Sequence, residues 1–264
     1  MSALGKAPAG DLAPNPDGCC VVVGATGAVG QAVVERLAGA GWPVVALARR
    51  ADELEQLKAS CPELISTLPV DLSSDEAVQT VAGQLDRPVS LAFFAAGLAV
   101  TGSADSMPPS DLAVACNVKV AGMARLVQAV RGHLEPGSRL LAVAGSLGLE
   151  PGPMDAAPGT VNAALLNLMR QYSQLYGPAG IITCTLMLGP LDTPRLRAFA
   201  DRRADESGRA AEDVLREYAE ATSLGRLPTP AEVAWLVESL MAPQAWLLHG
   251  AAICADAGVR RLIF

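Results

Sequence analysis

Short apolar runs alternate along the chain with segments whose apolar residues recur at helical spacing. The run CCVVVG (19–24) is continuously apolar and ends in glycine, as is typical of a strand buried on both faces of a sheet. The segment that follows, AVGQAVVERLAGAG (28–41), places Val29, Val33 and Leu37 on one helical face. The same pattern predicts further strands at 44–48, 64–72, 90–97, 138–146, 181–188 and 251–256. It predicts further helices at 51–59, 73–85, 111–134, 160–177 and 229–241.

Continuous apolar strands separated by helices predict a parallel sheet with helices on both faces. We therefore expect a single α/β domain over residues 18–264, built as a doubly wound parallel sheet. Residues 1–17 are rich in Ala, Pro and Gly and are expected to form a flexible arm. A small helical insertion is expected at about 194–222. A doubly wound sheet binds its ligand at the carboxyl ends of its strands, so the first strand-to-helix turn is the place to search.

Composition narrows the choice of partners. With 264 residues, 51% of them hydrophobic, the chain can bury a large core. Its net charge is −7 and no run of Lys or Arg exceeds two residues, so we expect no nucleic-acid partner. No apolar stretch approaches the ~18 uninterrupted residues of a membrane span, and we expect neither a membrane partner nor a secretory signal. The six cysteines show no metal-ligand spacing, which favours reduced thiols in a cytoplasmic protein and no metal site.

The first turn reads GATGAVG and places Gly24, Gly27 and Gly30 between the first strand and the first helix. Such small residues let the backbone approach a pyrophosphate, which the free N–H groups of the helix N-terminus then bind. The alternative is an ordinary tight turn. After the second strand come Arg49 and Arg50, where an NAD site usually has an acid for the ribose 2′-hydroxyl. Two cations favour the 2′-phosphate of NADP(H) over NAD(H), although they are also compatible with a solvated helix start.

From about residue 19 to 258 the chain resembles the short-chain dehydrogenase/reductase family. The resemblance rests on eight motifs in the same order: GATGAVG, ARRADEL, VDL, FAAG, CNV, AVAGSLG, LGPLDTP and GAAICADAG. It implies a Rossmann-like fold, a nicotinamide dinucleotide cofactor and a small-molecule substrate, with the insertion at 194–222 as a lid. It also implies a homodimer or homotetramer that pairs through the helices at 111–134 and 160–177.

The resemblance assigns roles residue by residue. It places the cofactor contacts at Gly24, Thr26, Gly27, Val29, Gly30, Arg49, Arg50, Asp71, Leu72, Ala96, Gly97, Asn162, Gly189, Leu191 and Thr193. Within that set, Asp71 corresponds to the acid at the adenine amino group and Thr193 to the residue that holds the nicotinamide amide. The catalytic positions are Ser146 and Asn117. Asn117 can equally be a polar group satisfied within a helix.

The loop SLGLEPGPMDAAPGTVN (146–162) lacks the central acid of that family. In the family a tyrosine after the serine protonates the carbonyl oxygen, and a lysine one helical turn later binds the ribose and lowers the pKa of the phenol. The segment NAALLNLMR aligns Asn162 with the lysine and Pro158 with the tyrosine. Proline has no proton to give, and asparagine carries no charge.

Three interpretations follow. The first is an NADP(H)-dependent oxidoreductase with non-standard proton delivery, from Asp155, Glu150, water or the substrate itself. Reduction of a conjugated carbon–carbon double bond would depend less on one fixed acid. The second is a non-redox enzyme that performs elimination or isomerisation, and the third is a catalytically inactive nucleotide-binding or partner subunit. We favour the first because the nucleotide features are more complete than the catalytic ones.

Overall fold

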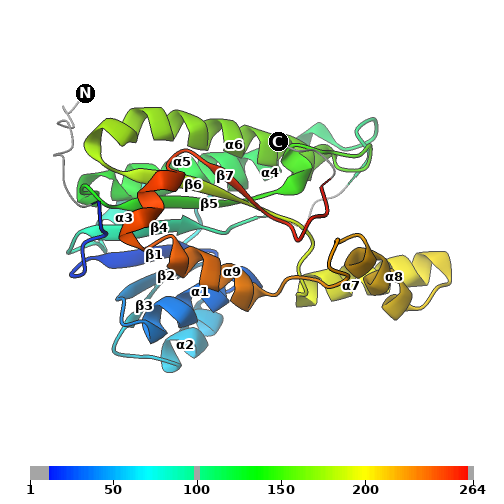
Figure 1. Ribbon diagram of the computed structural model, residues 1–264, viewed down its shortest axis with the longest axis horizontal. Coiled ribbons are helices and arrows are strands. Elements are labelled where there is room, and N and C mark those ends of the chain that lie inside the picture. The colour runs from blue at the N-terminus through cyan, green and yellow to red at the C-terminus, as the bar shows by residue number, and fades with distance from the viewer. Residues whose placement is uncertain (1–11, 98–101, 261–264) are drawn as a thin grey trace.

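The computed structural model describes residues 12–97 and 102–260 and shows a seven-stranded sheet between two layers of helices (Figure 1). The strands are β1 (Cys19–Val23), β2 (Val44–Ala48), β3 (Ile65–Pro69), β4 (Val89–Phe94), β5 (Arg139–Gly145), β6 (Ile182–Leu188) and β7 (Ala252–Ala255). Their order is β3-β2-β1-β4-β5-β6-β7, and every neighbouring pair is parallel. The order reverses between β1 and β4, which places the ligand crevice at the carboxyl ends of these strands. The predicted doubly wound α/β sheet is confirmed.

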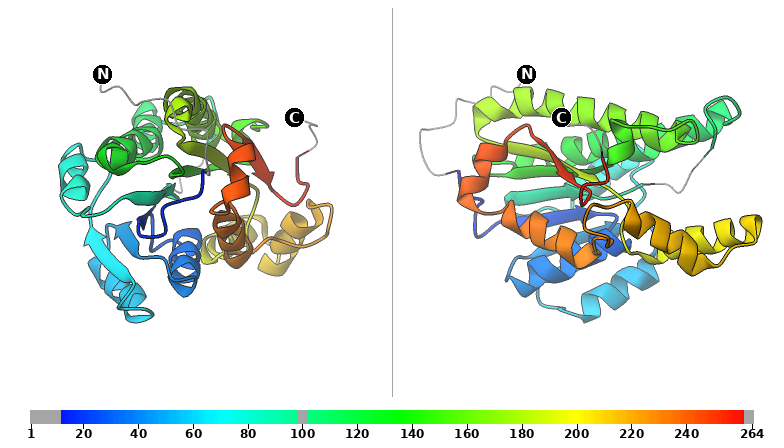
Figure 2. Two further views of the ribbon diagram at one scale, coloured as in Figure 1. Left: turned by 60° about the vertical axis from the view of Figure 1, so that its left-hand side comes forward. Right: turned by 45° about the vertical axis from the view of Figure 1, so that its right-hand side comes forward.

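Helices cover both faces of this sheet (Figure 2). One layer contains α1 (Ala28–Gly39), α2 (Ala51–Ala59) and α9 (Pro230–Ser239). The other contains α3 (Glu76–Ala82), α4 (Pro109–Cys116), α5 (Gly122–Val130) and α6 (Ala156–Tyr176). Short 3-10 turns complete the chain at η2 (Arg131–His133), η3 (Ser146–Gly148), η4 (Gly177–Ala179) and η5 (Pro243–Leu248).

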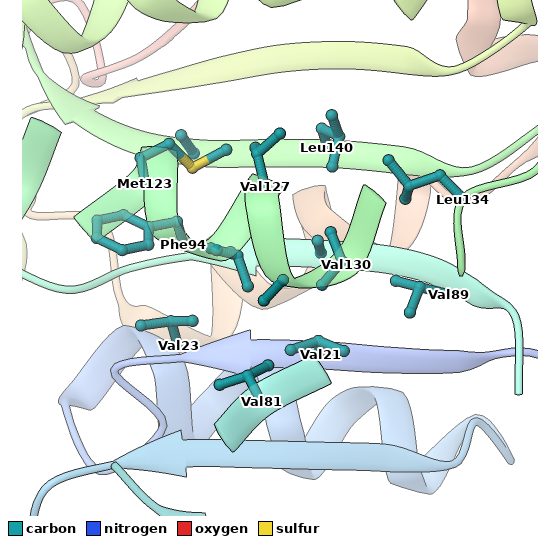
Figure 3. Close-up of a cluster of buried hydrophobic side chains, with 14 of the residues drawn as sticks. Val21, Val23, Val81, Val89, Phe94, Met123, Val127, Val130, Leu134 and Leu140 are labelled. Atoms are coloured by element: carbon teal, nitrogen blue, oxygen red, sulfur yellow. The ribbon is translucent and has the colours of Figure 1, made fainter. Parts of the chain in front are cut away.

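Alternate residues of β1 belong to two separate hydrophobic cores, one on each face of the sheet. Val21 and Val23 pack with the layer of α3 and α5, around Phe94 (Figure 3). Cys20 and Val22 pack with the layer of α1 and α9. All five residues of β1 are buried, which is why the sequence shows a continuous apolar run rather than an alternating one.

The long helix expected at 111–134 carries a π-helical turn, η1 (Asn117–Ala121), between α4 and α5. The stretch Pro109–His133 is long and apolar enough to cross a membrane by length and composition only. Its buried side chains, Met123 and Val127 among them, pack against Phe94 of the sheet (Figure 3). In this structure it is a core helix.

Two segments outside the sheet complete the fold. The expected insertion consists of α7 (Pro194–Ser207) and α8 (Ala211–Glu220), which project from the body as a helical pair (Figure 1). At the other end, the Leu12 carbonyl accepts a hydrogen bond from Arg139, and the Asn15 carbonyl accepts one from Ser90. Residues 12–17 are therefore part of the folded domain rather than of the predicted flexible arm, and residues 1–11 lie outside the described part of the chain.

Candidate functional site

The turn between β1 and α1 brings three glycines together. Gly24 has a φ of +78°, which L side chains rarely adopt, and Gly27 donates its N–H to the Gly24 carbonyl at 2.9 Å. A Cβ at Gly30 would lie 2.1 Å from the same carbonyl oxygen. The turn is thus kept free of side chains, and Thr26 and Val29 line it half-buried. This bare turn at a helix N-terminus fits the pyrophosphate of a dinucleotide.

Two exposed arginines follow β2. Arg50 donates to the Thr26 hydroxyl at 3.3 Å and pairs with Glu53 at 2.7 Å, so its guanidinium lies beside the glycine turn. Arg49 lies close enough to Asp71 to contribute to lowering the pKa of that carboxyl. This position therefore offers positive charge at the end of β2, where a 2′-phosphate would be bound.

Asp71 and Leu72 lie in the loop after β3, which ends at Pro69 rather than at the expected residue 72. The carboxylate of Asp71 accepts a hydrogen bond from the Ser73 N–H at 2.9 Å. That bond is the largest cause of its lowered pKa, with Arg49 and Arg125 contributing. Asp71 is therefore an ionised acceptor at the carboxyl edge of the sheet, while Leu72 is buried beneath it.

The loops after β4 and β5 pair with each other at the mouth of the crevice. Ala96 is half-buried and Gly97 is exposed at the end of β4. Gly102 then forms a parallel bridge with Asp155, and Ala104 donates to the Pro153 carbonyl at 2.9 Å. The loop that follows β5 is thus fixed against the loop that follows β4.

Ser146 and Asn162 meet at the end of β5. Ser146 begins η3 directly after the strand and is 8% exposed. The side chain of Asn162 lies against Gly145, where a Cβ would be 2.7 Å from its Nδ2. Its Oδ1 is buried with no hydrogen-bond partner among the described residues. An unsatisfied buried oxygen costs ~1–3 kcal/mol, and a hydroxyl donor such as that of a ribose would satisfy it.

The other polar groups near this loop already have partners. Asp155 accepts the Gly152 N–H at 2.8 Å, which holds the loop in shape. The side-chain amide of Asn117 donates a hydrogen bond to the Ser73 carbonyl at 2.9 Å. This bond supports the interpretation of Asn117 as a polar group that is satisfied within the protein. Pro158 is half-buried in the first turn of α6, where its missing N–H breaks no helical bond. Glu150 follows η3 and is also half-buried.

The segment after β6 forms the remaining wall. Gly189 packs against Asp256, to which a Cβ would approach within 2.9 Å, and Leu191 packs on the core beneath α1 and α9. Thr193 is the N-cap of α7, and its hydroxyl accepts the Leu196 N–H at 3.2 Å. The cofactor contacts predicted after β6 thus lie on the segment that connects β6 with α7, the first helix of the expected lid.

Our reading of the sequence did not identify Lys119, which lies in the π-helical turn. Its ammonium nitrogen is 3.7 Å from the position that a Cβ would take at Gly97. Removal of this group from water lowers its pKa to about 8, and Arg195 at the start of α7 adds to the effect. The one signal that the sequence offers is the scarcity of lysine, because the chain has only two others, Lys6 and Lys58.

Comparison with known proteins supplies the remaining evidence. The family model described as enoyl-(acyl carrier protein) reductase matches residues 24–260. An uncharacterized short-chain type dehydrogenase/reductase, y4vI of Sinorhizobium fredii, is 24% identical over 94% of this chain. The NADPH-dependent reductase BacG of Bacillus subtilis is 23% identical over 92% of this chain and 97% of its own. The chain spans 44%, 46% and 48% of the length of the first three curated relatives, y4vI among them.

Solved structures share the fold. L-sorbose reductase from Gluconobacter frateurii, crystallised with NADPH and L-sorbose, superimposes with a TM-score of 0.87 at 18% identity. The match covers 94% of this chain and 100% of that one. At this identity the likeness concerns the fold alone.

Proposed function

Because this chain belongs to the short-chain dehydrogenase/reductase family, we propose that it is an NADP(H)-dependent oxidoreductase acting on a small molecule. The observation that carries the proposal is the pair of cations after β2: Arg50 contacts Thr26 in the bare turn of Gly24 and Gly30, and Arg49 lies near Asp71. The name of BacG as an NADPH-dependent reductase and the NADPH held by L-sorbose reductase support the same cofactor.

Each part of the crevice has a role in this proposal. Arg49 and Arg50 would bind the 2′-phosphate, and the glycine turn would take the pyrophosphate. Asn162 would accept a hydrogen bond from the nicotinamide ribose. When bound, the cofactor supplies hydride to a substrate carbon. Ser146 would donate a hydrogen bond to the substrate oxygen.

Proton delivery in this proposal differs from that of the family pattern. Pro158 has no proton to give, and the carboxylate of Asp155 is occupied by the Gly152 N–H. The proton therefore has to come from a group outside the α6 positions used by the family. A substrate with a conjugated double bond would relax this requirement, because hydride addition then produces an enolate.

A second candidate follows from the same two positions. Pro158 and Asn162 also suit a non-redox enzyme that performs elimination or isomerisation, or an inactive nucleotide-binding partner subunit. These functions predict no oxidation of NADPH with any carbonyl or enone substrate, and the inactive subunit still allows cofactor binding.

Calorimetric titration with NADPH and NADH tests the cofactor. Charge-assisted hydrogen bonds contribute ~1.5–3 kcal/mol each, so we expect NADPH to bind ~10–100-fold more tightly than NADH. Arg49→Ala and Arg50→Ala should each reduce the preference, while Arg209→Ala, which removes a lid residue paired with Glu217, should not. Equal affinities or tighter NADH would refute the NADP(H) assignment. No binding of either would favour a function without cofactor.

We also propose that the protein acts in the cytoplasm. Its six cysteines are free thiols in the structure, and burial raises the pKa of Cys19 and Cys184 to about 11, so that these two stay protonated. Unpaired buried thiols are typical of a reducing compartment.

A further inference from the structure

Lys119 lies at the carboxyl edge of the sheet, between the loop after β4 and the start of α7. Its ammonium is beside Gly97, which follows β4, and close enough to Arg195, which follows β6, for the two charges to interact. The strand between β4 and β6 is β5, and β5 leads directly into Ser146. Ser146 thus follows the strand that lies between the two strands whose following segments approach Lys119.

The charges around Lys119 favour loss of its proton. The helices that pack against η1 carry Asp111 on α4, Arg125 on α5 and Arg170 on α6, and none of these shifts its pKa. Arg125 pairs with Asp75 instead. Among the described residues, Arg195 is the charged group that acts on Lys119, and it acts in the same direction as burial.

We propose that Lys119 is the proton donor of this enzyme and replaces the acid that α6 lacks. The inference rests on the proposed oxidoreductase function. It makes Lys119 a catalytic residue supplied by the π-helical turn, a different element from the one that carries Pro158 and Asn162.

The step balances in atoms and charge. Reduction of a carbonyl adds hydride to carbon and a proton to oxygen, and NADPH is oxidised to NADP⁺. As the new O–H bond forms, an N–H bond of the Lys119 ammonium breaks, which leaves a neutral amine. A hydronium ion of the solvent then returns a proton to the amine, so each reduction consumes one proton. In the reverse direction the neutral amine accepts the proton of the alcohol.

The acidity of Lys119 suits this task. A general acid works best when its pKa lies near the operating pH, and that of Lys119 is about 8 in the protein without cofactor. Below that pH the ammonium is the major form and can donate. Above it the amine dominates, so reduction slows and alcohol oxidation accelerates. The negative charge of a bound dinucleotide should move this transition to higher pH.

Direct titration tests the inference without turnover. The chain has three lysines, so protein labelled with ¹³C at the lysine ε-carbons gives three side-chain signals, and Lys119→Arg identifies one by its loss. We expect that signal to titrate near pH 8 and to move upward with NADP⁺. In the protein without NADP⁺, Arg195→Met should raise the midpoint of the Lys119 titration, because it removes the positive charge that lowers this pKa. Titration at the solution value of ~10.4 would overturn the inference.

Rates with an activated ketone, 2,2,2-trifluoroacetophenone, test the role itself. We expect NADPH oxidation to be constant below the transition and to fall about tenfold per pH unit above it. Lys119→Met should lower the rate of NADPH oxidation by ~10²–10⁴-fold. The fall in rate at high pH should also disappear in this variant. Lys119→Arg keeps the positive charge but has a pKa above ~12, so it should lose as much. Lys58→Met, a substitution on α2, is the control and should change neither.

The outcomes separate the two proposals. Full activity in Lys119→Arg would show that charge alone matters, and an unchanged pH limb in Lys119→Met would show that another group titrates. Either result overturns this inference while the proposed function stands. No NADPH oxidation with this ketone by a protein that binds NADPH overturns this inference alone. No NADPH binding overturns the proposed function and this inference with it.

Discussion

At the scale of single residues, our alignment places Pro158 and Asn162 at the tyrosine and lysine positions of the family on α6. The helix itself is present, and Asn162 lies beside Gly145 at the end of β5. A lysine at 162 would start from the same backbone position, and a tyrosine at 158 would extend from the first turn of α6. The alignment therefore predicts that new side chains at 158 and 162 are enough to restore the family's acid, because the helix that would carry them is present.

We predict that Pro158→Tyr combined with Asn162→Lys raises reduction of simple ketones by NADPH. The wild-type protein should be slower than the double variant, because it has Lys119 in place of the family's activated phenol, and a well-positioned general acid contributes ~10²–10⁴-fold. The double variant should recover at least ~10-fold of this in kcat/KM. Pro158→Tyr alone should recover less, since the phenol pKa would remain near ~10 without the lysine.

The control for this prediction is the melting temperature of each variant, which should stay close to that of the wild type. A folded but inactive double variant would mean that the loop at 146–155 holds position 158 away from Ser146. Fast reduction of simple ketones by the wild type, with no gain in the double variant, would instead mean that the proposed donor Lys119 is already sufficient.

The sequence predicted some of these residues better than others. The roles of Gly24 and Gly30 depend on the backbone geometry of one stretch of seven residues. The glycine motif alone indicates that geometry. Arg50 meets Thr26 because β1 and β2 are neighbours, which the alternation of elements already implied. Lys119 depends on strand order and on a π-helical turn, and neither is visible in its local sequence.

At the scale of elements, the sequence predicted every strand and every long helix in type but not in every boundary. The pattern indicated one helix over 111–134, because an extra residue in a π turn leaves the run of apolar residues intact. It also placed the start of α6 at 160, whereas the helix begins at Ala156. Pro158 and Gly159 suggested a loop, but proline is tolerated in a first helical turn.

The turn from β1 to α1 gives the prediction at this scale. Gly30→Ala should destabilise the domain by ~1–3 kcal/mol, because the new methyl group would overlap the Gly24 carbonyl and backbone cannot rotate away. The same displacement should weaken NADPH binding. Urea unfolding and calorimetry measure the two effects.

Gly39→Ala is the matched control on the same helix. Among the described residues outside its own stretch of helix, no atom lies within 4 Å of a Cβ at Gly39, and alanine is favoured over glycine in a helix by ~1 kcal/mol. We expect equal or higher stability and unchanged NADPH affinity. If Gly30→Ala behaves as Gly39→Ala does, the close approach at the turn is not a constraint.

At the scale of the whole molecule, strand order assembles a site from distant parts of the chain. Arg50, Asp71, Gly97, Ser146 and Thr193 follow five different strands, and all emerge at the carboxyl edge of the sheet. Hydrophobic pattern predicted a parallel sheet, and a parallel sheet requires this shared edge. What it could not supply is the depth to which each side chain is buried, which decides the protonation of Lys119 and the unsatisfied oxygen of Asn162.

The surface of the α4–α5 and α6 layer leads to a prediction about assembly. These helices lie side by side on the outside of the sheet (Figures 1 and 2) and expose large apolar side chains, with Val114 52% exposed and Leu175 60% exposed. Exposed apolar side chains on adjacent helices favour association of identical subunits. We therefore expect light scattering to give a dimer or tetramer of the 27.1 kDa chain.

Substitutions on that layer decide whether it forms the interface. Val114→Arg and Leu175→Arg, alone or together, should lower the measured mass, because a charge buried between two subunits is costly without a partner. Leu224→Arg is the matched control: Leu224 is 73% exposed and lies between the lid and α9, so the mass should not change. A monomeric wild-type protein would contradict the predicted assembly. An oligomer that survives both substitutions but dissociates in Leu224→Arg would place the interface on the lid side of the domain instead.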